Sequence, residues 1–498
     1  MMLAQTANQG QLRIPVEYSA VLPVLALIGG ALVLLTWSSL TRHRRAGGYA
    51  LVTVVSGAVA LGGAWRLWNR IGDHGPIRAM ADAVVIDGFA VFFMVVISIA
   101  VVLAALVGDA YLRREDLEGP EFHVLLLLSA SGGMLMATAN DLIVLFLGLE
   151  ILSIALYVLA GFHGRRQQSY EAAMKYFVLG AFSSALLLYG IALVYGSTGS
   201  TNLATIATYL AGNVAVDNGL MLAGMVLLLV GLGFKVAAVP FHMWTPDVYQ
   251  GSPTPVTGFM AAAAKAAGFA GLLRVFVSTF DTLKLDWQPI IAVLAVATLL
   301  VGSVLAVVQT DIKRMLAYSS ISHAGYVLVG LQAASKRGIA GALFYLLAYT
   351  FMVLGSFAIV TVVARRGDAD HDLESYRGLA RNRPALALAF TVLLMAQAGI
   401  PFTTGFLAKF YVIAAAVDSG SYVLATIAML AAVIAAFFYL RVILVMYAPA
   451  AEGDEPLVRL PVPRTVGLAL VVTVAFTVAV GLLPGPVIDF ARHATLIF

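Results

Sequence analysis

The sequence predicts an all-α integral membrane protein with about 14 transmembrane helices, on the strength of two observations. First, 61% of the 498 residues are hydrophobic and only 11% are charged, whereas an ordinary soluble domain has about 25% charged residues. Second, apolar runs of roughly 20 residues recur along the whole chain, and each is long enough to cross a hydrocarbon core about 30 Å thick. Because lipid offers the backbone no hydrogen-bond partners, each run is expected to form a helix.

The expected spans follow one another closely. They cover residues 18–37, 49–68, 88–108, 122–139, 142–162, 171–196, 219–249, 255–278, 288–309, 313–333, 338–364, 385–416, 422–447 and 464–483. The longest connections, near 197–218 and 365–384, have roughly 20 residues. No soluble domain is therefore expected between the spans.

Several kinds of chemistry are disfavoured by the composition. The chain has no cysteine, which excludes disulfides and cysteine-ligated iron–sulfur clusters on it. A haem would need facing axial ligands, but of the eight histidines only His323 is expected at mid-bilayer. The formal charge of +4 belongs to the loops, so no nucleic-acid partner is expected. We expect neither a metal nor a cofactor on this chain.

Loop charges predict the orientation. Sixteen basic residues fall on one side of the predicted topology: Arg42, Arg44, Arg45, Arg113, Arg114, Arg165, Arg166, Lys313, Arg314, Arg365, Arg366, Arg377, Arg381, Arg383, Arg459 and Arg464. Seven fall on the other: Arg13, Arg70, Arg78, Lys284, Lys336, Arg337 and Arg492. The positive-inside rule then predicts that both termini lie outside, which is the periplasmic side of a bacterial inner membrane.

Two predicted spans are overlong and interrupted. The seventh reads GLGFKVAAVPFHMW around Pro240, and the twelfth reads AQAGIPFTTGFLAKF around Pro401. Paired broken helices are typical of inverted-repeat transporters, although each could also be an ordinary proline kink. The two lie five spans apart and so run in opposite directions, which predicts two inverted five-helix repeats, spans 4–8 and spans 9–13. The expected units are an N-terminal three-helix segment, the first repeat, the second repeat and a C-terminal helix, at residues 1–120, 121–280, 287–448 and 449–498.

Lysine is distributed unusually in this chain. Of its seven lysines, four lie inside apolar spans, namely Lys175, Lys235, Lys265 and Lys409, whereas nearly all 23 arginines lie in loops or at helix ends. A charged group at the bilayer centre costs about 2.5–3.5 kcal/mol even on a lenient scale. Lysine loses its proton on burial far more readily than arginine does. The pattern therefore indicates a path that loads and releases protons.

The depths of these residues support a path. At about 1.5 Å per helical residue, Glu150, Lys265 and His323 lie about 14–15 Å from the predicted span ends. Lys235 and Lys409 each lie about two helical turns or less from a break. We expect these five residues to form a row across the midplane, in which charged and neutral sites can pass a proton along.

Simpler interpretations remain for some of these residues. Lys175 is near a span end, so it could extend to the surface instead of joining a relay. His323 could be a neutral polar contact between helices, and Glu150 with Lys235 could be a structural pair. His242, beside the break in the seventh span, is interpreted as a packing or interface residue.

Lys265 and Lys409 have no evident structural reason to be buried. Asp87, Arg274 and Arg441 lie near span ends and are interpreted as anchors. A sugar or amino-acid carrier would explain the broken helices but not several buried lysines spread over both repeats. A structural scaffold would not explain the buried lysines either.

Three motifs resemble a known family. The stretch 231–269, GLGFKVAAVPFHMWTPDVYQGSPTPVTGFMAAAAKAAGF, is similar to the signature of the antiporter-like, proton-translocating subunits of respiratory complex I, and PDVYQGSPTPVTGF is most similar to subunit N. DIKRMLAYSSISHAGY (311–326) and GIPFTTGFLAKF (399–410) agree with it. The resemblance runs from about span 4 to span 13.

The resemblance implies roles for residues of this chain. It implies that Glu150, Lys235, Lys265 and Lys409 form the proton pathway and that Lys175 and His323 are further polar positions on the same axis. Sister subunit M typically has a glutamate where Lys409 stands here.

The resemblance also implies the partners. Other membrane and peripheral subunits would carry the flavin, the iron–sulfur clusters and the quinone, and this chain would carry none of them. A subunit of a related cation/proton antiporter or membrane-bound hydrogenase shares the pump residues and remains the alternative. Neighbouring genes for flavin, iron–sulfur and quinone-site subunits would favour complex I.

Overall fold

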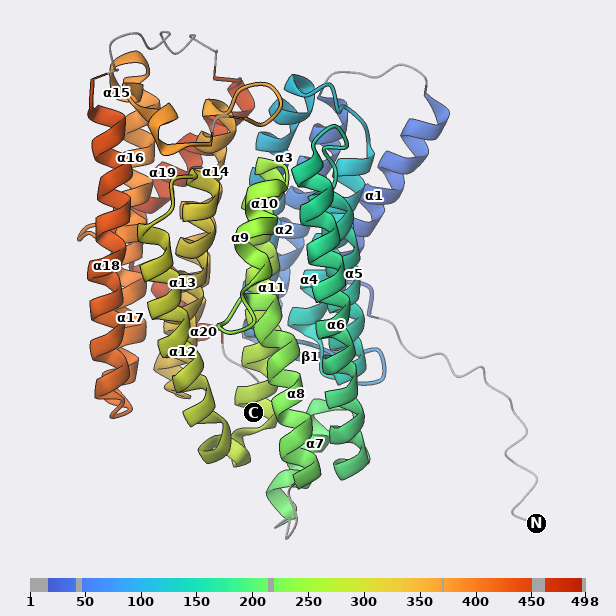
Figure 1. Cartoon of the computed structure of the whole chain (residues 1–498). Helices are drawn as coiled ribbons and strands as arrows, with labels where there is room; N and C mark the ends of the chain where they lie inside the picture. Colours follow the sequence, from blue (N-terminus) through green and yellow to red (C-terminus); the bar gives the residue numbers. More distant parts are fainter. Residues whose placement is uncertain (1–16, 42–46, 214–218, 370, 450–461, 495–498) are drawn as a thin grey trace, which may run out of the picture.

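The computed structural model describes residues 17–41, 47–213, 219–369, 371–449 and 462–494. Helices packed side by side form one elongated bundle (Figure 1). Loop charges at Arg13, Arg42, Arg44, Arg45 and Arg459 lie outside the described residues.

Twelve helices within the described residues are long and apolar enough to cross a membrane. They are α1 (Leu22–Leu40), α2 (Gly48–His74), α3 (Gly88–Arg114), α4 (Glu121–Thr138), α5 (Leu142–Ala160), α6 (Gln167–Thr198), α8 (Gly219–Val236), the segments Thr254–Thr279 and Asp281–Val307, α14 (Lys336–Val363), α18 (Tyr422–Tyr447) and α19 (Arg464–Leu482). This confirms an all-helical membrane protein.

Two of the predicted spans are more polar or shorter. One is α13 (Ile312–Gln332), and the other is divided into α16 (Pro384–Ala398) and α17 (Thr404–Asp418). Most of α13 is buried, so its lysine, serines and histidine face other helices. A helix inside a bundle does not need an apolar surface, which is why hydropathy alone underrates it.

The segment Thr254–Thr279 lies within the bundle, and all of its residues except Ser278 are buried. It consists of α10 (Thr254–Phe259), a π-helical turn (Met260–Ala264), α11 (Lys265–Leu273) and a second π-helical turn (Arg274–Thr279). Such turns are rare and occur frequently at functional sites. Lys265 begins α11 directly after the first of them.

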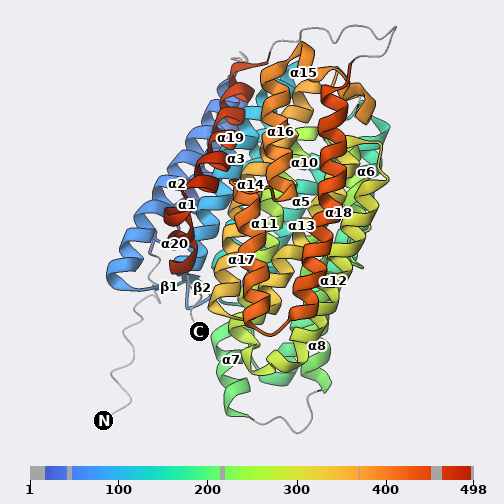
Figure 2. The same cartoon turned by 90° about the vertical axis from the view of Figure 1, so that its left-hand side faces the viewer.

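Short elements occupy the connections. They are the antiparallel hairpin β1 (Ile77–Ala79) and β2 (Val84–Ile86), α7 (Leu203–Gly212), α9 (Trp244–Gly251), the 3-10 turns Asp281–Leu283 and Leu373–Tyr376, α15 (Leu379–Asn382) and α20 (Gly485–His493). The long helix α12 (Lys284–Val307) follows the first of these 3-10 turns and completes the span Asp281–Val307. The segments predicted as long loops thus contain α7 and α15. The hairpin and α20 lie toward the end of the bundle opposite α15 (Figure 2).

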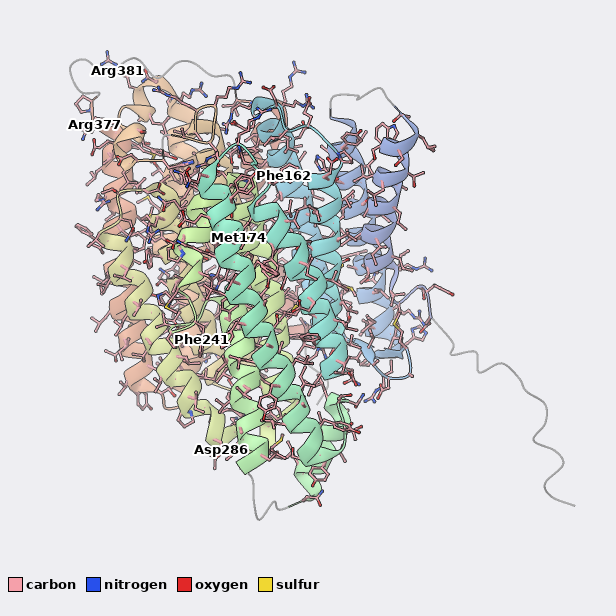
Figure 3. All side chains as sticks on the ribbon, turned by 45° about the vertical axis from the view of Figure 1, so that its right-hand side comes forward. Phe162, Met174, Phe241, Asp286, Arg377 and Arg381 are labelled. Carbon is pink, nitrogen blue, oxygen red and sulfur yellow. The ribbon has the colours of Figure 1, made fainter. Side chains whose placement is uncertain are left out.

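We name the two ends of the bundle by these elements. Arg377 and Arg381 lie at one end and Asp286 lies toward the other, with Phe241 between them (Figure 3). The first is called the arginine-rich end, because Arg114 also contacts the carbonyls of Thr361 and Ala364 there. The other, which carries β1 and β2, is called the hairpin end.

Both predicted helix breaks are present, and at the first of them two backbone groups are bonded to side chains. After α8, Ala237 has a φ of +62°, and the Val239 N–H donates to Thr298 Oγ1 at 2.9 Å. Trp244 Nε1 donates to the Phe234 carbonyl at 3.1 Å. After α16, Gly399 has a φ of +92°. Unsatisfied backbone groups are costly away from water, so these two partners help to stabilise the first break.

Candidate functional site

The three lysines that are predicted to lie deep in the membrane are all buried. The exposed fractions are 5% for Lys235, 3% for Lys265 and 5% for Lys409. None of the three forms an ion pair with a carboxylate among the described residues; each donates to neutral oxygen atoms instead. The partners of Lys235 and Lys265 come from helices that are distant in sequence, whereas those of Lys409 lie on α16, the helix just before its own.

Lys235 lies in the last turn of α8, just before the break. Its Nζ donates to Ser153 Oγ on α5 at 2.9 Å and to the Tyr176 hydroxyl on α6 at 3.0 Å. A Cβ at Gly268 would lie 3.2 Å from Lys235 Cγ. The lysine stem therefore passes over Gly268 of α11, one turn from Lys265 on the same face.

Lys265 reaches from α11 to α13. Its Nζ donates to the Ser320 carbonyl at 2.6 Å and also to the Ser320 hydroxyl. The hydroxyl can accept from an ammonium or donate to a neutral amine. This contact can therefore be kept whether or not the lysine holds its proton.

His323 lies on α13, one turn after Ser320, and is joined to two tyrosines. Its Nδ1 lies 2.6 Å from the Tyr345 hydroxyl and its Nε2 lies 3.0 Å from the Tyr439 hydroxyl. Tyr439 also contacts the Ser319 hydroxyl. These groups form a continuous hydrogen-bonded chain inside the second half of the bundle.

Lys409 lies on α17 and reaches back across the break to α16. Its Nζ donates to the Gln397 carbonyl at 2.9 Å and the Ala398 carbonyl at 2.8 Å. It also lies 5.0 Å from the centre of the Tyr326 ring, a favourable cation–π distance. The last carbonyls of a helix have no intrahelical partner and carry partial negative charge, so a cation is stabilised there.

Glu150 lies on α5 and is partly buried. Its Oε1 is buried without a hydrogen-bond partner among the described residues. Lys235 is close enough for a Coulombic interaction with it, but they form no ion pair within 4.0 Å there. Ser153, which accepts from Lys235, lies one turn after Glu150 and so on the same face of α5.

Lys175 is separate from the buried row. Its side chain is 40% exposed, and its Nζ lies 2.6 Å from Glu171 and 2.7 Å from Asp247. These three residues line a polar cavity of about 480 Å³, together with Arg166, Asp368 and His371. Met174, the preceding residue, lies nearer the arginine-rich end than Phe241 does (Figure 3).

A buried charge cluster beside this cavity was missed by the sequence analysis. Asp368 is fully buried, 3.3 Å from Lys313 and 2.9 Å from Arg166, and His371 Nε2 lies 3.3 Å away. Burial opposes the charged form of Asp368, but Lys313, His371 and Arg166 outweigh it and hold its pKa well below the ordinary value of 3.8. Nothing in the sequence near Lys313 marks it as buried, so the sequence alone predicts a loop charge there.

A second buried pair joins α3 to the second π-helical turn. The guanidinium of Arg274 binds both carboxylate oxygens of Asp87 at 2.8 and 3.0 Å, with exposed fractions of only 3% and 1%. Its Nε donates to the Ala137 carbonyl. These residues were interpreted as anchors near span ends, yet they bind each other inside the bundle. Arg441, on α18, donates to the Val307 carbonyl at the end of α12.

The buried cations thus fall into two groups. Lys313 and Arg274 are neutralised by a carboxylate and are typical of structural ion pairs. Lys235, Lys265 and Lys409 contact hydroxyls, carbonyls and rings. Such sites can exist in a protonated and a neutral form without leaving a buried carboxylate unpaired. Chemically, this row is suited to proton transfer.

The chain is similar to a known protein family over most of its length. Residues 139–435 match the family model described as NADH:quinone oxidoreductase/Mrp antiporter, TM. NADH-quinone oxidoreductase subunit N of Trichlorobacter lovleyi is 43% identical, covering 98% of this chain and 99% of its own length. Subunit N 1 of Solibacter usitatus is 40% identical, covering 95% of this chain and 96% of its own.

Solved structures show the same fold. A chain of respiratory complex I from Thermus thermophilus with bound aureothin has a TM-score of 0.79 and 34% identity, covering 94% of this chain and 99% of its own. A chain of the Mrp complex from Dietzia sp. has a TM-score of 0.84 at 21% identity, covering 96% of each chain. At that identity the second likeness concerns the fold alone.

Proposed function

Because the chain belongs to the subunit N family of NADH-quinone oxidoreductases, we propose that it is the antiporter-like subunit that carries protons across the membrane in complex I. Other membrane and peripheral subunits transfer electrons from NADH to quinone and hold the flavin and the iron–sulfur clusters. The proton pathway consists of Glu150, Lys235, Lys265 and Lys409, with Lys175 and His323 as relay positions.

One observation carries this proposal. Three buried lysines in one bundle have no carboxylate partner among the described residues, although the same bundle pairs Lys313 and Arg274 with aspartates. Burying an unpaired ammonium is expensive, and a structural role would favour either a partner or an apolar residue. A group that must give up its proton in each cycle explains the difference.

Protons would be taken up at the polar cavity of the arginine-rich end. Lys175 faces that cavity, and the next residue, Tyr176, accepts a hydrogen bond from Lys235. The Tyr176 ring stacks on Trp244 at 4.6 Å, and Trp244 begins α9, which also carries Asp247. Helix α9 thus connects the cavity to the first buried lysine.

From Lys235 the row continues through neutral groups. The stem of Lys235 packs on Gly268 beside Lys265, and Lys265 donates to Ser320. The Ser319–Tyr439–His323–Tyr345 chain follows. Tyr345 stacks on Tyr326 at 5.8 Å, and the Lys409 ammonium lies over the Tyr326 ring.

Two inverted five-helix repeats, within about 14 spans, form the scaffold of this pathway. Their support is a repeated packing detail: a Cβ at Gly132 of α4 would meet the Leu152 backbone N at 2.5 Å, and a Cβ at Gly302 of α12 would meet the Ser322 backbone N at the same distance. Both glycines therefore allow close packing on the following helix. The two repeats comprise residues 121–280 and 287–448. The N-terminal segment 1–120 and the C-terminal segment 449–498 flank them.

The hydrogen bond made by the first residue of the second helix in each pair is repeated as well. The Leu142 N–H donates to the Thr201 carbonyl near β2, and the Ile312 N–H donates to the His371 carbonyl near α15. The two connections belong to opposite ends of the bundle, as an inverted repeat requires.

The arginine-rich end faces the cytoplasm and both termini lie outside, in the bacterial inner membrane. The chain has no cysteine, so single cysteines can be labelled without background. A membrane-impermeant thiol reagent should label Met80→Cys in intact spheroplasts, and Arg377→Cys only in inverted vesicles. The opposite labelling pattern would reverse the orientation and the direction of the pathway.

The function is tested in the assembled complex. Complex I purified through this chain and reconstituted into proteoliposomes should pump protons with NADH and quinone. Lys235→Met should reduce pumping while the complex stays assembled, and Lys284→Met, at the hairpin end, should not. If the chain instead co-purifies with a cation/proton antiporter or a membrane-bound hydrogenase, the assignment to complex I is wrong.

A further inference from the structure

A second cavity, lined by other residues than those of the proton row, combines cations with an apolar floor. It measures about 350 Å³ and lies where the start of α14, the middle of α17 and the end of α20 meet. Its rim carries Lys336, Arg337 and Arg492, and its floor includes Phe344, Tyr411 and Ile488. The proposed proton pathway uses none of these residues.

The rim retains positive charge after its own pairs are counted. Arg337 forms an ion pair with Asp418 in which both side chains are half exposed. Arg492 lies 3.8 Å from Asp489, and Lys336 forms no ion pair with any described residue. Lys336 and Arg337 are also the first residues of α14, where the helix dipole attracts an anion.

The rim lies at the level of lipid headgroups. Helix α14 has 28 residues and is about 42 Å long, so it exceeds a hydrocarbon core of about 30 Å. Its other end contacts Arg114 at the arginine-rich end, so Lys336 lies at the hairpin end. Helix α20 lies near that end too (Figure 2) and is held by Phe490 against Trp68 and Phe92.

We propose that this cavity binds one anionic phospholipid. The phosphate diester lies among Lys336, Arg337 and Arg492, and the start of an acyl chain covers Phe344, Tyr411 and Ile488. The combination selects this occupant: a free phosphate would not need the apolar floor, and a zwitterionic lipid would gain less from the excess of positive charge. The inference depends on the membrane fold and not on the proton pathway.

The test compares two lipids in the intact complex. The complex is purified, delipidated and titrated with spin-labelled phosphatidylglycerol or phosphatidylcholine, and electron paramagnetic resonance measures the motionally restricted lipid. We expect a saturable site that prefers phosphatidylglycerol in wild type. Lys336→Gln should weaken it about fivefold, because one cation near the membrane surface contributes roughly that factor.

Two further variants make the result specific. Arg78→Gln, on the exposed hairpin of the same end, is the charge control and should leave the preference unchanged. Ala340→Phe fills the cavity without altering charge, and should abolish the site for both lipids. Inorganic phosphate should not displace the bound lipid.

Three results would each overturn the proposal. They are an unchanged phosphatidylglycerol preference in Lys336→Gln/Arg492→Gln, displacement of the lipid by inorganic phosphate, and loss of a neighbouring subunit from the complex in that variant. The last would mean that the cavity is covered by protein.

Discussion

Lys409 Nζ donates to the carbonyl oxygen of Ala398 across 2.8 Å, so the cation of α17 closes the broken end of α16. A second bond to the Gln397 carbonyl is 2.9 Å long. The lysine therefore has two tasks: it satisfies the free carbonyls of a helix end inside the membrane, and it is the last cation of the buried row.

We expect Lys409→Ala to impair both tasks. Loss of a proton-transfer group should reduce pumping on the order of 100-fold, and the carbonyls left without a donor should lower the unfolding temperature of the complex. Lys409→Gln can still donate one hydrogen bond, so it should recover stability without recovering pumping. Recovery of pumping by Lys409→Gln would remove Lys409 from the pathway.

We expect Lys265→Ala to leave the complex assembled but to reduce pumping and coupled quinone reduction on the order of 100-fold. Lys265→Arg should not restore them, because a guanidinium does not release its proton. The quenching of a pH-sensitive fluorescent dye in proteoliposomes measures the proton pumping of both variants. Full pumping by either variant would contradict the role given to Lys265.

Glu150 and Lys235 are expected to act as a switchable pair. When Glu150 is near, Lys235 holds its proton, and when it turns away or is neutralised, the proton passes toward Lys265. The structure has Lys235 bonded to Ser153 and Tyr176, which is the arrangement expected with the carboxylate apart. Activities of Glu150→Gln, Lys235→Ala and the double variant should deviate from additivity by about 0.5–3 kcal/mol. Simple additivity would mean that the two act independently.

Asp87 and Arg274 should instead prove structural. Asp87→Asn leaves a buried guanidinium without its partner, which typically costs about 3–5 kcal/mol. The unfolding temperature and the amount of assembled complex should fall, while pumping per assembled complex is maintained. Asp82→Asn, which breaks an exposed pair with Arg78, is the control and should cost at most about 1 kcal/mol. Normal stability of Asp87→Asn would contradict this assignment.

Asp368 should make the arginine-rich end sensitive to acid. Because its folded pKa lies below the ordinary value of 3.8, its contribution to stability is present above that value and is lost as the pH falls through the folded pKa. Asp368→Asn should lower the unfolding temperature at pH 7 and flatten its decline below about pH 4. Asp372→Asn, in the same loop but exposed, serves as control. An equally steep decline in Asp368→Asn would exclude this carboxylate as the cause.

The membrane fold and the buried lysines could be read from the sequence. Apolar runs predict helices because partitioning into lipid depends on local composition. A lysine within such a run is conspicuous because its cost is also local. Pro240 and Pro401 marked the two breaks because proline lacks a backbone donor. None of these inferences needed contacts between distant residues.

What surrounds each charge was decided by tertiary structure alone. Lys235 finds Ser153 and Tyr176, and Lys313 finds Asp368, yet no local pattern separates the two lysines. Their partners lie far away in sequence, on α5 and α6 for Lys235 and in the loop after α14 for Lys313. Only the packing of the bundle therefore determines whether a lysine is neutralised by a carboxylate or contacts neutral oxygens. That difference, which follows from the cost of an unpaired buried charge, separates the proposed proton carriers from the structural cations.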